Sequence, residues 1–592
     1  MNYKKISGLL GILMLMGLLS CKKSLENLLT DPNYPSPSTA DVDLYLNQVQ
    51  TSFNYLWTTA SDYGAQLTRQ QNWGGPKYRN AYTPPTFDGE WQIAYAGGGA
   101  NYGAYSGTLG ASAKVFGGVI SNADALIALA EPQKKYIQAG IARILKAFAL
   151  SILVDDFGDV PYSEADLGNA NTNPKADGGA LVYAGALNLL DSGIVDLQKT
   201  GAAKGPALDL YYPGDKEVAH WITLAKTLKL KLYMQTRLVD NTAAAKIQAL
   251  LTENDLINTA AQDFVFKFGT SVTSPDSRHE HYALDYVASG GVGEYASNYF
   301  IWMLSTQKYG GNLNMNGDPR LRYYYYRQVG NYAWANTQTC PCYINSQFGN
   351  AIYPAWYPAV PTATPFCVVG KGYMGRDHGD NSGAPPDGSF RTAWGVYPAG
   401  GQFDADQAEA VTLSMGGQGA GINPIWVSTF TRFLEAEAAN VLGITTQGDA
   451  RTLLQQGVQG SIDMVMAFPA TVNVTPDPAF VPSTTQVSNY VNKVLNMYDT
   501  ATSADSKLNI IMTEYYLALW GNGVESYNNY RRTGKPSNMQ IPVADPNPGL
   551  FMRSFYYPSV FVNRNSNAPA QKTPGDAVNK VFWDNNPDNF VK

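Results

Sequence analysis

The sequence predicts a mainly α-helical fold in which pairs of helices flank a large irregular, loop-rich region. Two observations support this fold class. Apolar residues recur at every third or fourth position in segments near both ends of the chain, and this spacing buries one face of a helix. Between residues 262 and 423 the helical spacing fades, while Gly, Pro, Tyr and Trp accumulate. A stretch of this length without regular structure is usually functional or elaborately folded.

The part before this region contains five expected helical zones. The strongest is 136–154, where Ile141, Leu145 and Phe148 belong to one apolar stripe. It stops at the Phe-Gly-Asp-Val-Pro segment, 157–161, because Gly and Pro interrupt helical geometry. Successive helices of this kind pack as pairs, each burying a face against its neighbour. The five zones are 41–59, 91–130, 136–154, 182–197 and 217–238.

Helical patterning returns after the loop-rich region. Inside that region we expect only one short helix, at 294–305. Tryptophans on helices are usually core residues, so we expect those of this chain to be buried. The later helices are expected at 426–442, 451–466, 485–498 and 507–530.

These elements suggest how the chain is divided. We expect a single domain over 38–592, because both helical parts share one pattern and the irregular region interrupts it. Its expected parts are an N-terminal helical part (38–261), the loop-rich insertion (262–423), a C-terminal helical part (424–540) and C-terminal loops (541–592).

The N-terminus has the features of a lipoprotein signal peptide. Two lysines precede an uncharged apolar run, 6–19, which is too short to span a membrane. A small residue and Cys21 follow it. A cysteine at this cleavage point takes a diacylglycerol and a further acyl chain such as palmitate, and several acyl chains anchor a protein stably. We expect a signal peptide over 1–20, lipidation of Cys21 and a proline-rich tether over 21–37, with no later membrane-spanning segment.

Composition suits a loop-rich exported protein. Hydrophobic residues make up 45% of the chain and charged residues only 15%, while 39 Tyr nearly equal the 42 Lys plus Arg. The formal charge of −6, or −8 without the signal peptide, argues against nucleic acid as a partner. Cys340, Cys342 and Cys367 allow one structural disulfide in an oxidising compartment, with Cys342–Cys367 as one of the possible pairs.

Motifs for catalysis and metal binding are missing from the sequence. There is no Gly-x-Ser-x-Gly, Walker or HExxH pattern. His279 and His281 are expected on one face of a strand, but no third ligand is spaced for zinc. The segment 312–317 begins like a calcium loop, yet its twelfth position is Tyr323 instead of Glu. We expect a non-catalytic protein without a cofactor; a structural calcium ion held by Asp and Asn loops is the alternative left open.

Several segments, in the right order, resemble the SusD/RagB family of outer-membrane lipoproteins. They include the helix that ends in Phe-Gly-Asp-Val-Pro, the Asp318-Pro319-Arg320-Leu321 segment and the Glu-Ser-Tyr-Asn-Asn-Tyr-Arg-Arg-Thr-Gly segment from Glu525. Two further segments, 372–381 and 392–398, resemble the type 2 branch of the family. Together the matches extend from about residue 31 to 583. The sparse acidic residues after Cys21 depart from the pattern of surface-exposed lipoproteins.

The resemblance implies an α-superhelix of tetratricopeptide-like helix pairs, with the loop-rich region laid over it. It also implies anchoring in the cell outer membrane, facing the exterior, and a partner, a SusC-like TonB-dependent β-barrel transporter. The lipoprotein would capture an oligosaccharide and deliver it to that barrel. Three alternatives remain: a peptide ligand, as in RagB-like members, a surface glycoside hydrolase, and an adhesive or structural lipoprotein without a transport partner.

Sugar binding needs flat aromatic faces beside planar polar groups, and three clusters offer both. The resemblance places binding aromatics in the loop after the first helix. The alternatives are that Trp73 packs against the scaffold and that the 376–381 cluster is a loop locked by its own hydrogen bonds. The candidate ligand-binding residues are Trp73, Tyr78, Arg79, Trp334, Trp356, Arg376, Asp377, Asp380, Asn381 and Trp394.

Overall fold

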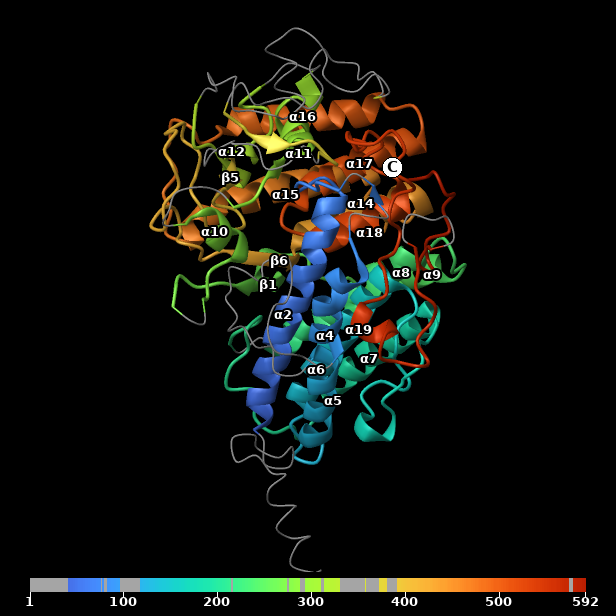
Figure 1. Ribbon diagram of the computed structural model, residues 1–592. Helices are drawn as coiled ribbons and strands as arrows, with labels where there is room; N and C mark the ends of the chain where they lie inside the picture. Colours follow the sequence, from blue (N-terminus) through green and yellow to red (C-terminus); the bar gives the residue numbers. More distant parts are fainter. Residues whose placement is uncertain are drawn as a thin grey trace, which may run out of the picture.

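The computed structural model gives a mainly helical molecule in which α2 (Val42–Leu67) runs through the centre (Figure 1). Helices α4 to α8 lie around one half of α2, helices α14 to α18 lie around its other end, where α18 packs against it, and the loop-rich region covers one side. The fold class expected from the sequence is confirmed. The structure describes residues 41–75, 77–78, 82–95, 118–214, 217–273, 276–287, 293–309, 314–330, 357, 372–380, 391–573 and 579–592.

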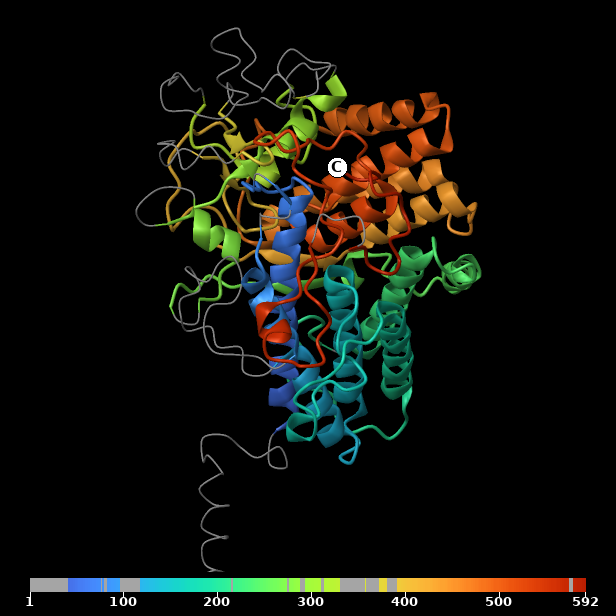
Figure 2. The ribbon, with the colours of Figure 1, turned by 45° about the vertical axis from the view of Figure 1, so that its right-hand side comes forward.

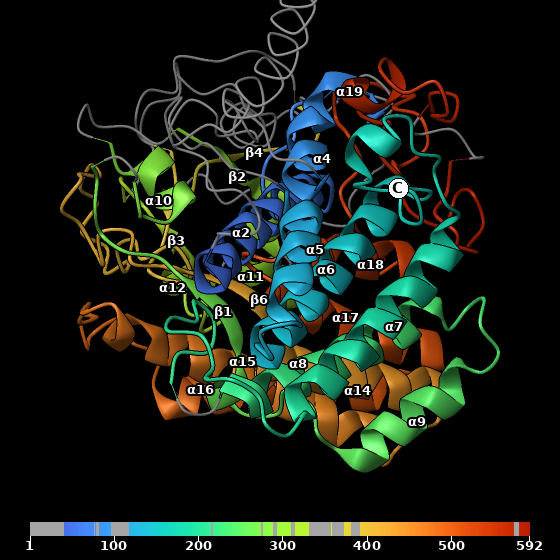
Figure 3. The same cartoon turned by 90° about the horizontal axis from the view of Figure 1, so that it is seen from below.

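The N-terminal helices form the layer that is seen from below in Figure 3. All five expected zones contain helix, and α2 extends eight residues past its expected end at residue 59. Helix α9 and two short 3₁₀ helices near this group were not expected from the sequence. The elements are η2 (Pro84–Phe87), α4 (Asp88–Tyr95), α5 (Val119–Ala130), α6 (Tyr136–Phe157), η3 (Gly168–Ala170), α7 (Gly179–Gln198), α8 (Glu217–Thr236) and α9 (Ala243–Glu253).

The C-terminal helices stack as a second group, which Figure 2 shows beside the first. One expectation was wrong: the segment 507–530 is two helices instead of one. Gly521 adopts a φ of 88°, and the Asn522 side chain accepts a hydrogen bond from the Glu525 N–H, so a new helix starts there. The elements are α14 (Ser428–Leu442), α15 (Ala450–Thr471), α16 (Thr484–Thr500), α17 (Ala504–Ala518) and α18 (Gly523–Thr533).

The loop-rich region is closed at its base by a two-stranded sheet. Strand β1 (Phe264–Lys267) pairs antiparallel with β6 (Ile422–Trp426), so the first and last residues of the insertion are joined where it meets the helices. Two smaller sheets pair β2 with β4 and β3 with β5. The remaining elements are η4 (Ala260–Gln262), α10 (Glu280–Asp285), β2 (Ala296–Ser297), α11 (Asn298–Ser305), η5 (Gln307–Tyr309), α12 (Leu321–Tyr324), β3 (Tyr325–Tyr326), β4 (Gly375–Arg376) and β5 (Ala393–Trp394).

The strand expected at His279 and His281 is also wrong. His279 is the N-cap of α10, and its side chain accepts a hydrogen bond from the His281 N–H. The two imidazoles therefore lie at the start of a helix. The start of so short a helix produces no repeating pattern in the sequence, so it could not be predicted.

Helix α6 is the centre of the N-terminal group. By length and hydropathy α6 and α7 could each cross a membrane, but 83% of the apolar window of α6 is buried inside the protein. Its Arg143 and Lys146 form ion pairs with Asp196 and Asp124. Helix α7 lies close against it because Gly140 has no side chain; a Cβ there would lie 2.9 Å from the Gly193 carbonyl oxygen. We interpret α6 as the core helix of a packed array.

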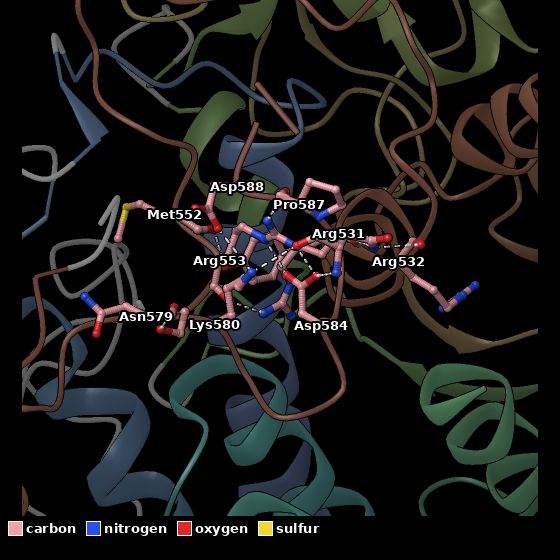
Figure 4. A network of polar contacts seen from close by, with 12 residues as sticks. Arg531, Arg532, Met552, Arg553, Asn579, Lys580, Asp584, Pro587 and Asp588 are labelled. Atoms are coloured by element: carbon pink, nitrogen blue, oxygen red, sulfur yellow. Dashed lines mark hydrogen bonds and ion pairs between the residues drawn. The ribbon is translucent and has the colours of Figure 1, made fainter. Parts of the chain in front are cut away.

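The C-terminal loops are pinned to the helices by a polar network (Figure 4). Arg531 of α18 donates to the carbonyl oxygen of Arg553, and the Arg553 guanidinium pairs with Asp584. Asn586 donates back to the Arg531 carbonyl oxygen. Within the described residues of the expected loops, 541–573 and 579–592, the short helix α19 (Ser559–Val562) is the only helix. The polar groups of this segment bond both to the scaffold and to one another, and these bonds hold the loops in place without regular structure.

Candidate functional site

The loop after α2 is held by Arg69, which lies just past the C-cap Thr68 and adopts a φ of 61°. The buried Arg69 guanidinium donates to the carbonyl oxygens of Leu67, Gln540 and Lys592 and to the Tyr78 hydroxyl, at 2.6–2.8 Å. These bonds connect residues far apart in the chain. They fix both the direction in which the chain leaves α2 and the position of Tyr78.

Trp73 and Tyr78 form a buried aromatic stack with His378. The rings of Trp73 and Tyr78 are parallel within 13° at 4.9 Å, and the His378 ring lies 4.7 Å from that of Trp73. The Tyr78 hydroxyl lies 3.0 Å from His378 Nε2. Burial, reinforced by the charge of Arg69, holds the pKa of His378 well below its ordinary value, so the neutral ring accepts this bond. The stack leaves Trp73 3% and Tyr78 1% exposed.

The segment 372–380 lies against this loop. The Gly379 N–H donates to the Trp73 carbonyl oxygen at 2.7 Å. Arg376 pairs with Asp380 at 3.0 Å, and Asp377 accepts a hydrogen bond from Gln540 Nε2. The structure therefore brings Trp73 and Tyr78 together with the segment of Arg376, Asp377 and Asp380, although the two are some 300 positions apart in the chain.

Trp394 lies near the same loop, but its ring contacts His281 and Trp520 instead of the Trp73 stack. Its ring stacks on His281 at 3.8 Å and 6°, and on Trp520 at 4.2 Å. It is 5% exposed. The His281 ring also lies 3.3 Å from the Gln71 amide nitrogen, so Trp394 reaches the loop after α2 through His281.

The ring faces of Trp73, Tyr78 and Trp394 are thus covered by protein groups in this conformation. In the described part of the chain these rings connect loops to the scaffold, which matches the packing alternative that the sequence left open. A direct contact with a ligand stays a prediction for them. The other expected site residues lie outside the described residues: Cys21, Arg79, Trp334, Trp356 and Asn381, together with Cys340, Cys342 and Cys367.

Sequence reasoning missed the residues that join the clusters. Arg69, His281, His378 and Gln540 carry no periodic signal, and their roles come from contacts with distant segments. His378 lies within a segment already singled out by resemblance, which is the only signal that pointed to it. Among the described residues no three His, Cys, Asp or Glu side chains are grouped to hold a metal ion.

Two tryptophans and three acidic residues of the helical parts have structural roles. Trp221 of α8 is fully buried, as expected of a helical tryptophan, and Trp520, in the turn between α17 and α18, is 1% exposed. Glu435 pairs with Arg432, and Glu437 pairs with Arg532. Glu525 instead pairs with Lys231, at 3.2 Å. In the described part of the chain these carboxylates are bound in ion pairs within the helical scaffold, as expected of structural groups.

Two protein-family descriptions match different parts of the chain. Residues 96–340 match a family described as "Starch-binding associating with outer membrane", and residues 404–572 match "Susd and RagB outer membrane lipoprotein". Both descriptions place the proteins at the outer membrane, and the first adds starch binding. The two matches together span most of the chain, and the chain belongs to the SusD/RagB family. No match is found among curated proteins.

Solved structures of the same family share the fold. A SusD/RagB family protein from Bacteroides thetaiotaomicron is 17% identical, with a TM-score of 0.58, covering 92% of this chain and 99% of that one. A SusD homolog from Parabacteroides distasonis is 16% identical, with a TM-score of 0.59 over 93% and 99% of the two chains. A chitin-binding SusD homolog from Flavobacterium johnsoniae is 16% identical, with a TM-score of 0.52 over 92% and 99%.

Proposed function

We propose that this protein captures an oligosaccharide at the cell surface and delivers it to a SusC-like TonB-dependent transporter without cleaving it. One observation carries the proposal: the loop 71–78 and the segment 372–380, both rich in aromatic and planar polar side chains, are held against each other. Such groups combine stacking surfaces with hydrogen-bond partners for hydroxyls. Family membership supports a binding role at the outer membrane.

The proposed location rests on the N-terminal sequence. Cys21 follows an apolar run that ends in a small residue, the order expected of a lipoprotein signal peptide. We expect the protein to incorporate a palmitate analogue during growth and the Cys21→Ala variant to incorporate none. A label of equal intensity on the variant would exclude Cys21 as the anchor. Accessibility of the protein to protease added to intact cells tests its orientation.

Ligand capture is tested with a chain that lacks the residues up to Cys21, run through native gels that contain starch, glycol chitin, xylan or pectin. Chitin is included because a structural neighbour is described as chitin-binding. We expect at least one polysaccharide to retard the protein and Trp73→Ala to abolish the retardation.

The matched control is Trp302→Ala, because Trp302 is a buried tryptophan of α11 that was not assigned to the site. It removes a similar packing volume, so the two variants are compared only where circular dichroism shows both folded. Unchanged retardation of Trp73→Ala would reject this site, and no retardation by any polysaccharide would reject glycan capture in favour of peptide binding.

Two further measurements separate the remaining alternatives. Chromatography of each retained glycan after long incubation should show no shorter products, and release of oligosaccharides would establish a hydrolase. Affinity purification of the full chain from native membranes should bring down a large β-barrel protein. Its absence would favour the adhesive or structural alternative.

A further inference from the structure

His281 occupies a buried position between two carboxylates at the edge of the proposed site. Its Nδ1 lies 2.8 Å from Glu294 Oε2, and its Nε2 lies 3.4 Å from Asp62 Oδ1 at the side of α2. The ring is stacked face to face on Trp394. Asp62 keeps a second buried oxygen, Oδ2, without a hydrogen-bond partner. A protonated ring donates to both carboxylates, through Nδ1 to Glu294 and through Nε2 to Asp62 Oδ1.

The same imidazole contacts the loop that leads to Trp73. Gln71 Nε2 lies 3.3 Å from His281 Nε2. The backbone beside it is bonded to the segment that carries Glu294: the Asn72 N–H donates to the Tyr295 carbonyl oxygen at 3.2 Å, and Gln71 bridges to Ala296. Two partners of the His281 ring, Gln71 and Glu294, thus belong to chain segments that position Trp73, and another, Asp62, belongs to α2.

The two protonation states of the ring require different partners at Nε2. A neutral ring that donates from Nδ1 to Glu294 leaves Nε2 as an acceptor, and the Gln71 amide can donate to it. A charged ring carries hydrogen on both nitrogens, so Nε2 donates to Asp62 and can no longer accept from Gln71. The geometry contains both partners of Nε2, at 3.3 Å and 3.4 Å, and they exclude each other.

We propose that His281 is a positioning residue whose protonation state sets the conformation of the Gln71–Trp73 loop. Two small cavities give the loop room to change. One is lined by Gln71, His281 and Trp394, and the other by Asp62, His281 and Thr58. Each has space for about one water molecule, so a side-chain amide can turn there without unpacking the core.

The charges that face the ring determine the direction of the effect. Burial lowers the pKa of His281, but Glu294 and Asp62 outweigh it and raise that pKa well above its ordinary value. Burial raises the pKa of Asp62 to about 6 and that of Glu280 to about 7.

Two more groups of α10 face the cluster. Burial, followed by the charge of Glu294, raises the pKa of Asp285 well above its ordinary value, and burial lowers the pKa of His279, so that ring is neutral. The two carboxylates therefore favour the charged ring, which binds to both of them. The ring loses its proton as pH rises through this raised pKa, and the loop is then held through Gln71.

The test uses the full chain in detergent, with 5-fluorotryptophan in place of tryptophan. Fluorine NMR is recorded between about pH 6 and about pH 10. Trp73→Phe and Trp394→Phe serve only to assign the two resonances. Trp394 reports the charge of the ring stacked on it, and Trp73 reports the loop. We expect both resonances to move with one shared midpoint above neutral pH.

Three variants distinguish the cause. His281→Gln should remove the titration of both resonances. Glu294→Gln changes a partly exposed side chain and is less disruptive than His281→Gln. It should move the shared titration midpoint of the two resonances to lower pH, because the ring loses one neighbouring negative charge. His220→Gln, at a histidine of α8 outside this cluster, should leave both curves unchanged. A Trp394 titration that leaves Trp73 unmoved, or a Trp73 titration that persists in His281→Gln, would overturn the proposal.

The consequence for ligand affinity rests on the proposed function, but this experiment needs no ligand. Failure of glycan capture would therefore leave the loop result standing, and failure of the loop result would leave glycan capture untouched.

Discussion

At the scale of single residues, buried polar groups decide how the irregular parts are held. Arg69 illustrates this best, because one guanidinium satisfies three backbone carbonyl oxygens and the Tyr78 hydroxyl. Buried carbonyl groups that lose a charged donor cost free energy, since nothing else can reach them. The loop after α2 therefore depends on one side chain that no sequence period distinguishes.

Replacing Arg69 by Met should lower the free energy of unfolding by about 3 kcal/mol, because several buried acceptors lose a charged donor. Urea denaturation followed by circular dichroism measures this change. The control is Arg451→Met. Arg451 of α15 forms an exposed ion pair with Asp499 of α16, so its loss should change the stability little. A loss for Arg69→Met no larger than the control would show that these bonds are not needed.

A second residue-scale prediction concerns Glu90 and Asp156, which face each other between α4 and α6. Burial, then the charge of Asp156, raises the pKa of Glu90 well above its ordinary value, and burial raises that of Asp156 to about 7. The folded state therefore holds more protons than the unfolded state between about pH 4 and about pH 7, so stability falls as pH rises through that range.

Asp156→Asn should remove part of this slope, by at most about 1.4 kcal/mol per pH unit for one proton. The measurement is the unfolding free energy of both proteins at several pH values across the window. Parallel curves for the two proteins would contradict the assignment.

At the scale of elements, most helices were predictable because they depend on local spacing. The stripe of α6 and the caps of α16 and α17 lie within a few residues of the positions they determine. The break between α17 and α18 was not predictable, since apolar spacing continues through it and the turn depends on Gly521 and Asn522. The short α10 has too few residues to show any period.

Close helix packing gives an element-scale prediction. Helices α2 and α18 touch at Gly64 and Gly523, and a Cβ on Gly64 would overlap the Gly523 carbonyl oxygen. Gly64→Ala should therefore lower the stability by roughly 2 kcal/mol or more, although alanine favours helix by about 1 kcal/mol. Gly178→Ala, where a Cβ meets open space, is the matched control and should be close to neutral. The measurement is the thermal unfolding midpoint of each variant. Equal midpoints for Gly64→Ala and Gly178→Ala would contradict the close contact between α2 and α18.

At the scale of the whole molecule, segments without regular structure connect the helical groups. The sheet of β1 and β6 joins the two ends of the loop-rich region. The C-terminal loops return to α6, where the Trp583 indole donates to Asp155 at 2.9 Å. These contacts join distant parts of the chain, so the loops contribute to the fold instead of decorating it.

Deleting residues 579–592 should destabilise the whole protein, because Arg553 loses Asp584 and the buried Trp583 leaves the core. The milder Asp584→Asn variant should retain the fold and unfold at a lower temperature in calorimetry. Lys580→Ala, in the same segment but at a more exposed ion pair, should unfold near the temperature of the unchanged protein. A truncated chain with an unchanged transition would contradict this role.

The sequence by itself determined the mainly helical class, the positions of the long helices, the family resemblance and the location of the loop-rich region. Each of these follows from spacing or motifs within a few turns of chain. Only the tertiary structure decided that the Trp73 loop lies against the segment of Arg376 and Asp380, and that the described aromatic faces are covered. Such pairings join residues about 300 positions apart, and they depend on which surfaces bury each other when the whole chain packs, a property that no local pattern contains.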